Sequence, residues 1–176
     1  MIKTNKIIER EIPRKVFLYE VILDIDEKYF INQIESCLKE QNLYYKTNVK
    51  GQMTSWNAFN ENEKFLNVIK EGSTYIQKYK EFPRLSLESA WGLKIEKGDY
   101  THRHNHAECT LSGILYLNDI NQDLIFPDLK ISVTPQKGSF LMFSSWLDHM
   151  ANINHNDFAK YAIAFNFQEH KDKTWS

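Results

Sequence analysis

The hydrophobic pattern of the chain changes at Leu85, and from there onward it has a period of two. Successive side chains of a β-strand point to opposite faces, so this period is typical of strands with one buried face. The apolar segments are short and are separated by Gly, Pro, Asn and Asp; they cover residues 87–106, 111–119, 124–128, 130–135, 138–145 and 160–170. Many short strands joined by turns predict an antiparallel β-sandwich of jelly-roll type.

The N-terminal half has a helical pattern instead. After a predicted strand at 16–23, residues 24–41 carry apolar side chains at helical spacing, with Asp24 or Asp26 as the N-cap. A second amphipathic helix is predicted at about 60–80. Two helices are therefore expected to support the β-sandwich.

A chain of 176 residues is long enough for one domain with its own core. No repeat or low-complexity linker divides it, so residues 1–176 are predicted to form a single domain. Within it, helical support covers about 24–80, including a polar turn at 46–56, and the β core covers about 85–170.

Charge and cysteine content exclude several classes of protein. The net charge is -1 and the basic residues are scattered, which argues against an electrostatically driven nucleic-acid binder. Cys37 and Cys109 form no CxxC motif and are expected to be reduced thiols. No segment has the roughly 20 apolar residues of a membrane helix, and residues 1–15 lack the apolar run of a signal peptide. We therefore expect a soluble, cytoplasmic protein.

The most informative short segment is HRHNHAE, residues 102–108, which places three histidines and a glutamate at alternate positions. If this segment is a strand, all four side chains share one face. Two such histidines can chelate a divalent metal through neutral imidazole nitrogens, with a third ligand from another strand. His149 follows the predicted strand 138–145, which in a jelly roll can run beside the strand that ends at His106. Three protein ligands leave metal positions open for a co-substrate and dioxygen.

Longer motifs give these histidines a family context. From Trp91 the segment WGLKIEKGDYTHRHNH is similar to a group of phage-encoded and bacterial 2-oxoglutarate/Fe(II) oxygenases, whose pattern is W-G, K-G-D-Y, H-x-H and then S-G-V-Y-Y. Here the chain continues as HNHAECTLSGILYLND, and FSSWLDH and KYAIAFNF resemble the later family motifs F-P-x-W-L-x-H and R-I-x-x-x-F-N. With NVKGQMTSW upstream, the resemblance spans most of residues 47–168. It implies an α+β, mainly β fold: a double-stranded β-helix (jelly-roll, cupin-like) with two supporting N-terminal helices.

The resemblance assigns roles to five residues. The family's H-x-H pair falls on His104 and His106, and its distal histidine falls on His149. The basic residue that holds the far carboxylate of 2-oxoglutarate falls on Lys160, and the second aromatic of S-G-V-Y-Y, a second contact to the co-substrate, falls on Tyr116.

The co-substrate site departs from the family pattern at two positions. Most relatives have Arg where this chain has Lys160, and Lys is a point charge rather than a planar fork. Ala162 stands where many oxygenases place a Ser or Thr hydroxyl for the same carboxylate. Both departures are expected to weaken the binding of 2-oxoglutarate.

Two ligand sets for the metal stay open. The H-x-H motif implies His104, His106 and His149. The wider superfamily uses two histidines and one carboxylate, and Glu108 could restore that set with His106 and His149. We favour the three histidines, with Glu108 in an outer role and His102 at the surface or the pocket rim.

Three further residues flank the metal motifs. Trp91 and Trp146 are predicted either to line a substrate pocket or to pack in the core. Asp148, beside the distal histidine, is predicted either to accept a hydrogen bond from His149 or to be a solvated loop acid.

Together the motifs predict a non-haem Fe(II), 2-oxoglutarate-dependent dioxygenase, a hydroxylase that uses O2 and releases succinate and CO2. The alternatives are a cupin-like three-histidine dioxygenase without 2-oxoglutarate and a non-catalytic metal- or ligand-binding β-sandwich. YLN (116–118) and KYAI (160–163) resemble prolyl hydroxylases, which favours a protein residue as substrate; a small metabolite and a nucleobase are the alternatives. The Lys- and Asn-rich composition is compatible with a phage, in which case the location is the host cytoplasm. A homodimer is one assembly the sequence allows.

Overall fold

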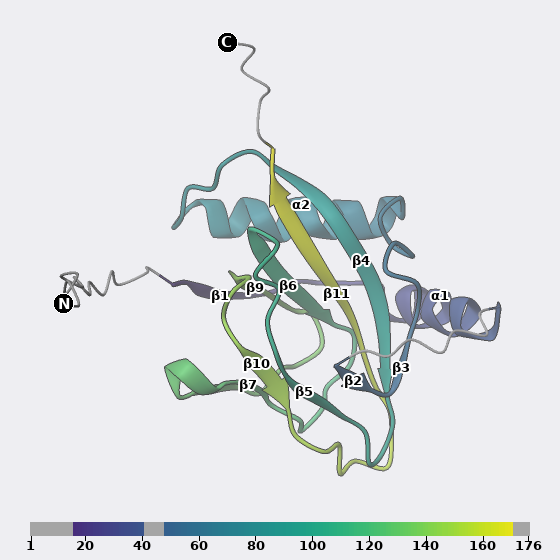
Figure 1. Ribbon diagram of the computed structural model, residues 1–176. Coiled ribbons are helices and arrows are strands. Elements are labelled where there is room, and N and C mark those ends of the chain that lie inside the picture. Colours follow the sequence, from purple (N-terminus) through teal and green to yellow (C-terminus); the bar gives the residue numbers. More distant parts are fainter. Residues whose placement is uncertain (1–15, 41–47, 171–176) are drawn as a thin grey trace, which may run out of the picture.

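The computed structural model describes residues 16–40 and 48–170, which form two antiparallel sheets and two helices (Figure 1). The strands are β1 (Leu18–Ile22), β2 (Val49–Lys50), β3 (Gln52–Met53), β4 (Leu85–Ile95), β5 (Tyr100–His104), β6 (Leu111–Tyr116), β7 (Leu124–Phe126), β8 (Ile131–Val133), β9 (Ser139–Ser144), β10 (His149–Ala151) and β11 (Lys160–Glu169). One sheet has six strands in the order β1-β9-β6-β11-β4-β3, and the other has five in the order β2-β5-β10-β7-β8. A short 3-10 helix, Pro127–Leu129, follows β7.

Both helices pack against the six-stranded sheet, on the side away from the five-stranded sheet (Figure 1). α1 (Glu27–Glu40) begins where the Asp26 carboxylate accepts a hydrogen bond from Tyr29 N, 3.2 Å away, so Asp26 rather than Asp24 caps it. α2 (Glu63–Gln77) is capped in the same way by Asn62, which accepts from Phe65 N at 3.0 Å. Their apolar faces meet the sheet in the main hydrophobic core, which includes Phe30, Ile34, Phe65, Ile69, Ile76, Phe140, Ile163 and Phe165.

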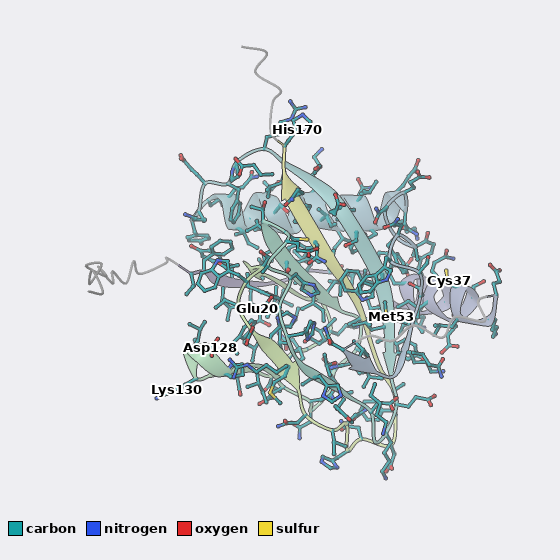
Figure 2. The ribbon with its side chains drawn as sticks, viewed as in Figure 1. Glu20, Cys37, Met53, Asp128, Lys130 and His170 are labelled. Atoms are coloured by element: carbon teal, nitrogen blue, oxygen red, sulfur yellow. The ribbon has the colours of Figure 1, made fainter. Side chains whose placement is uncertain are left out.

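Alternation along β11 divides its side chains between two environments. Ile163 and Phe165 belong to the core beneath the helices, while Ala162 and Ala164 pack with clusters on the opposite face. Lys160 has the same parity as the alanines, so it also faces the space between the two sheets. Figure 2 shows the side chains of the described residues in the same view as Figure 1.

The predicted helices and the first strand are present with shorter bounds. The strand predicted at 16–23 is β1, and the helices predicted at 24–41 and about 60–80 are α1 and α2. Gln41 and the predicted features of residues 1–15 lie outside the described residues, as do 171–176 of the predicted domain. Neither described helix is long and apolar enough to cross a bilayer.

Two predictions of strand arrangement are wrong. Within the polar turn predicted at 46–56, β2 pairs with β5 and β3 pairs with β4, so this segment extends both sheets; Lys46 and Thr47 lie outside the described residues. The segment 138–145 does not run beside β5, because β9 pairs with β1 and β6 in the other sheet. The neighbour of β5 is β10, a three-residue strand too short to give a periodic signal.

Candidate metal centre and its pocket

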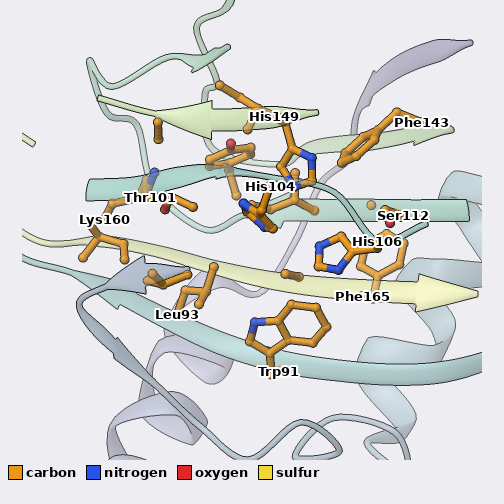
Figure 3. Close-up of a pocket in the computed structure, with 18 residues that line it drawn as sticks. Trp91, Leu93, Thr101, His104, His106, Ser112, Phe143, His149, Lys160 and Phe165 are labelled. Carbon is orange, nitrogen blue, oxygen red and sulfur yellow. The ribbon is translucent and has the colours of Figure 1, made fainter. Parts of the chain in front are cut away.

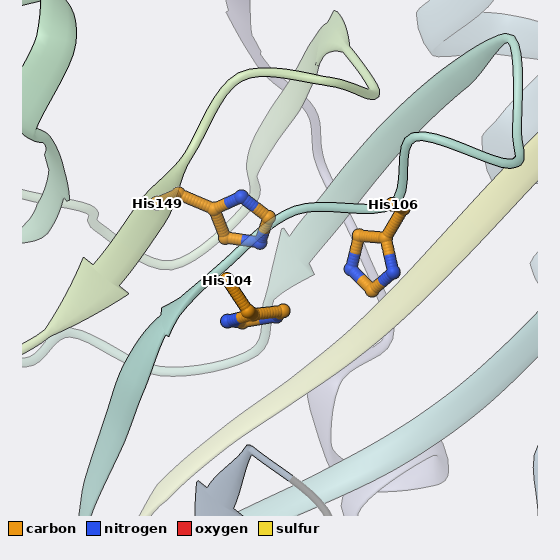
Figure 4. A group of neighbouring side chains, drawn as sticks. All are labelled: His104, His106 and His149. Atoms are coloured by element: carbon orange, nitrogen blue, oxygen red, sulfur yellow. The ribbon is translucent and has the colours of Figure 1, made fainter.

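Three histidines meet between the sheets (Figure 4). His104 is the last residue of β5, His149 is the first residue of β10, and the antiparallel register places them opposite each other. His106 reaches the same point from the loop that follows β5. One ring nitrogen from each histidine lies within 4.8 Å of the others, and no other group of three possible ligands occurs in the described ranges.

Backbone carbonyls fix the orientation of two of the rings. His104 Nδ1 lies 2.8 Å from the carbonyl oxygen of His102, and His149 Nδ1 lies 3.0 Å from that of Leu147. Because a carbonyl oxygen only accepts, each Nδ1 carries the proton and donates it. The lone pair of each ring is therefore on Nε2, ready for a metal.

Burial keeps the three imidazoles neutral. Desolvation is the main cause that lowers the pKa of His149 to about 3 and that of His106 to about 4, and the neighbouring His104 lowers both further. The pKa of His104 is also lowered, mainly by burial. At neutral pH the group presents unprotonated nitrogens, which is the form that binds metals.

Residues 102–108 do not form one strand, so the condition under which their four side chains would share a face is not met. β5 ends at His104, and Asn105 turns the chain by accepting a hydrogen bond from Ala107 N at 3.2 Å. Glu108 is exposed in this turn, where its backbone carbonyl accepts from Gln168 Nε2 at 3.1 Å. The structure does not bring Glu108 into the histidine group.

His102 is separated from the group by an irregularity in β5. His149 pairs with His104 but Ala151 pairs with Thr101, so β5 has one more residue than β10 over this stretch. Such a bulge interrupts the alternation of side chains. Thr101 consequently lines the cavity near His104, whereas His102 is exposed and its ring contacts Tyr100.

Asp148 plays neither of the roles that its position in the sequence indicated. It does not hydrogen bond to His149, whose Nδ1 is held by Leu147 instead. Its carboxylate accepts from Asn105 Nδ2 at 2.6 Å and from Arg103 Nε at 2.7 Å, and these two hydrogen bonds hold its pKa below the usual range. Asp148 thus braces both residues that flank His104 in the sequence.

A cavity of about 60 Å³ lies between the sheets and contains the histidine group (Figure 3). Lys160 lies at the left of the view and Ser112 and Phe165 lie toward the right, with the histidines between them and Trp91 below the histidines. By volume the cavity can hold several water molecules or a small organic acid.

Lys160 is buried and has no counter-ion in the part of the chain that the structure describes. Only 3% of the residue is exposed, and desolvation lowers its pKa to about 8. Its Nζ lies 5.8 Å from the centroid of the Tyr116 ring, and no carboxylate of the described residues forms an ion pair with it. A buried charge without a partner is costly, so this cavity end favours an anion.

The predicted aromatic residues differ in their relation to the cavity. Tyr116 lines it, and burial raises the pKa of its hydroxyl. Trp91 also lines it, with its ring centroid 6.0 Å from that of His106. Trp146 does not line it; it is half-buried against a cluster that includes Phe143. A substrate contact for Trp146 stays a prediction.

Sequence reasoning missed Thr101 and Ser112, which both line the cavity. Ser112 could have been found, because it lies four residues before Tyr116 on the same strand and therefore faces the same way. Thr101 could not, because only the bulge in β5 turns it toward the cavity.

Comparison with known proteins gives a clear result for the fold. No protein-family model and no curated protein sequence matches the chain. Solved structures do match. The 2-oxoglutarate complex of the viral collagen prolyl hydroxylase from Paramecium bursaria Chlorella virus-1 is 14% identical with a TM-score of 0.67, over 87% of this chain and 96% of that one. A prolyl-4-hydroxylase from Pseudomonas putida is 13% identical with a TM-score of 0.63, over 88% and 93%. HygX from Streptomyces hygroscopicus, with nickel and 2-oxoglutarate bound, is 11% identical with a TM-score of 0.64, over 92% and 85%.

At these identities the likeness establishes the fold. The chain has the double-stranded β-helix, or jelly-roll, fold of 2-oxoglutarate/Fe(II) oxygenases, and the predicted fold class is confirmed. Because the matches extend over most of both chains, they cover the helices and the β core together.

Proposed function

We propose that this protein is a non-haem Fe(II), 2-oxoglutarate-dependent oxygenase that hydroxylates a C–H bond. The observation that carries the proposal is one cavity lined by three neutral histidines and by a buried lysine that has no counter-ion among the described residues. The first feature suits a divalent metal and the second suits an anion, so the cavity has a place for both parts of the cofactor.

The donor set fits Fe(II). His104, His106 and His149 would hold the metal through ring nitrogens, and imidazole is a ligand that iron accepts readily. Two of the rings already have their lone pairs on Nε2 because of the carbonyls behind them. Three protein ligands leave positions for a bidentate co-substrate and for dioxygen.

The other end of the cavity fits the distal carboxylate of 2-oxoglutarate. Lys160 would supply the positive charge. Ala162 contributes no hydroxyl, but Thr101 and Tyr116 line the same cavity and offer hydroxyl groups to a carboxylate. In Figure 3, Thr101 lies beside Lys160. These hydroxyls offset the loss of a planar Arg fork.

When bound, Fe(II) and 2-oxoglutarate supply the oxidising chemistry: substrate C–H, O2 and 2-oxoglutarate give the alcohol, succinate and CO2. The residues of the chain orient the two components and exclude water. Leu93, Phe143 and Trp91 give the cavity apolar walls, which limit side reactions of an oxidising centre.

The substrate is proposed to be a protein residue, with a small molecule as the alternative. The similarity of the fold to collagen prolyl hydroxylase supports the former. A homodimer, a phage origin and a cytoplasmic location stay predictions from the sequence.

Succinate formation tests the proposal. Protein loaded with Fe(II) and 2-oxoglutarate in air should release succinate slowly even without substrate, and Lys160→Ala should abolish this release. Lys97→Ala, which removes an exposed lysine, is the matched control and should behave like the wild type. Oxygen uptake without 2-oxoglutarate would instead indicate a cupin-like dioxygenase. Metal binding without oxygen uptake would indicate a non-catalytic protein.

A further inference from the structure

A row of polar side chains crosses the inner face of the six-stranded sheet, away from Lys160. Asn166 on β11 is paired in register with Ser112 on β6 and with Ser89 on β4. Ser112 and Asn166 are 2% and 5% exposed, and Ser112 lines the cavity beside His106 in Figure 3. Ser112 therefore brings one member of the row into the wall of the cavity, at the end that the co-substrate does not need.

The hydrogen bonds in this row have a direction. Ser112 Oγ donates to Asn166 Oδ1 at 2.7 Å, and Asn166 Nδ2 donates to Ser89 Oγ at 3.3 Å. A serine hydroxyl has one proton, so Ser112 has none left for a ligand. What it can offer to the cavity is a lone pair, which accepts a hydrogen bond.

The surroundings define the charge of the group that fits here. Lys160, at the other end of the cavity, is the only lysine, arginine or carboxylate side chain among the residues that line it. At the Ser112 end an anionic group would meet an acceptor instead of a donor, and a cationic group would find no carboxylate to pair with. Trp91 and Ile114 provide apolar surface for the remainder of the ligand.

We propose that this end of the cavity is the substrate subsite, and that Ser112 accepts a hydrogen bond from an N–H or O–H of an uncharged substrate group. Asn166 acts as a positioning residue because it holds the Ser112 proton. The inference rests on the proposed function and adds the substrate class: a neutral amide or alcohol carried on an apolar or ring-shaped body.

The row is difficult to explain as packing alone. The neighbouring residues of the same parity on β11 and β6 are Ala162, Ala164 and Ile114, so the fold accepts apolar side chains on this face. Burying two hydrogen-bonded polar side chains, Ser112 and Asn166, instead contributes little to stability and makes the row vulnerable to the loss of one member. The row does, however, present a hydrogen-bond acceptor of fixed orientation to a ligand.

Two small probes test the subsite: 2-pyrrolidinone, which has a ring N–H, and cyclopentanone, which has the same ring size and only an acceptor. Binding is measured by ligand-observed NMR to full-length protein loaded with Zn(II), which cannot turn over, with and without 2-oxoglutarate. We expect the wild type to bind 2-pyrrolidinone about three- to tenfold more tightly than cyclopentanone. Ser112→Ala should remove this preference.

The Asn166→Ala variant distinguishes a role of Asn166 in orienting the Ser112 proton from a role in packing alone. Without Asn166 the Ser112 proton is free to turn toward the cavity, so cyclopentanone should bind more tightly than to the wild type and the preference should shrink. Loss of packing alone would weaken both probes together. Ser86→Ala, at an exposed position of β4, is the control and should leave the preference unchanged.

Equal binding of the two probes to the wild type, or an unchanged preference in Ser112→Ala, would overturn the proposal. Zn(II) titration and thermal melting identify a variant that has not folded, and Asn166→Ala then carries the test. Failure of the proposed function is a separate result: the wild type would not bind 2-oxoglutarate, while the probe preference could still be measured with Zn(II) alone.

Discussion

His149 and His104 face each other across the antiparallel pair formed by β10 and β5, and their ring centroids are 4.3 Å apart. The backbone register of two strands therefore sets the spacing of these two candidate ligands. His106 completes the group from a loop, where its backbone N–H donates to the Ser145 carbonyl at 2.7 Å. Two of the three ligands are fixed by sheet pairing, and the third is held by this hydrogen bond and by one that its carbonyl accepts from Cys109 N at 2.8 Å.

Alanine substitutions should distinguish His106, a member of the histidine group, from His102, which is close in the sequence but lies outside the group. We expect His106→Ala to weaken Zn(II) or Fe(II) binding by more than the roughly 10- to 100-fold that loss of an outer partner costs. His102→Ala removes an exposed imidazole and should leave the affinity near the wild-type value. Isothermal titration with each metal measures both. Equal losses in the two variants would contradict the assignment.

A substitution of Glu108 distinguishes the two ligand sets that the sequence left open, three histidines or two histidines with this carboxylate. The glutamate is exposed and outside the histidine group, so Glu108→Gln should change metal affinity by less than about fivefold, the range of an exposed charge. A loss comparable to that of His106→Ala would show that the carboxylate is a ligand after all. The same titration provides the answer.

Lys160 should reduce the stability of the protein in the absence of its anion. Replacing it by Met removes a buried charge that has no partner among the described residues, and we expect the free energy of unfolding at pH 7 to rise by on the order of 1 to 3 kcal/mol. The same variant should lose 2-oxoglutarate binding by at least about tenfold. Chemical denaturation and ligand titration measure these opposite effects.

The stability difference between Lys160→Met and the wild type should depend on pH. The pKa of Lys160 is about 8 in the folded protein and 10.5 in the unfolded chain, so folding releases a proton between these values. Wild-type stability should therefore rise relative to the variant from about pH 8 to 10.5, and the gap should be widest below pH 8. A gap that does not change with pH would show that the charge is not its cause.

The Asp148 brace should affect the metal site indirectly. Asp148→Ala frees Arg103 and Asn105 on either side of His104, and we expect metal affinity to fall by about two- to tenfold with little change in melting temperature. Asp157→Ala, which breaks an exposed ion pair with Lys97, is the control. An effect of the same size in the control would contradict a specific role for the brace.

The main strands and both helices could be predicted because each has a repeating pattern that is local in the sequence. β10 could not, because it has three residues and exists only through its pairing with β5 and β7. The bulge in β5 is also set by that pairing, and it is the reason that alternation failed at His102 and His104. Pairing partners far apart in the chain leave no periodic signal.

The candidate ligands were found from motif resemblance, whereas their chemical state needed the structure. The sequence placed His104, His106 and His149 together, but not the carbonyls that set the tautomers. It also offered Lys160 as a carboxylate partner without showing its burial, since most lysines are exposed. Ser112 and Asn166 carry no motif for function, and only their hydrogen bond in the cavity wall distinguishes them.

The central claim is that the histidine group and Lys160 bind one Fe(II) and one 2-oxoglutarate in the same cavity. An anaerobic titration tests it most directly, because chelation of Fe(II) by 2-oxoglutarate produces a weak visible charge-transfer band. We predict that the band develops in the wild type and in His102→Ala, and that it is lost in both His106→Ala and Lys160→Met. Absence of the band from the wild type at saturating Fe(II) and 2-oxoglutarate would contradict the account.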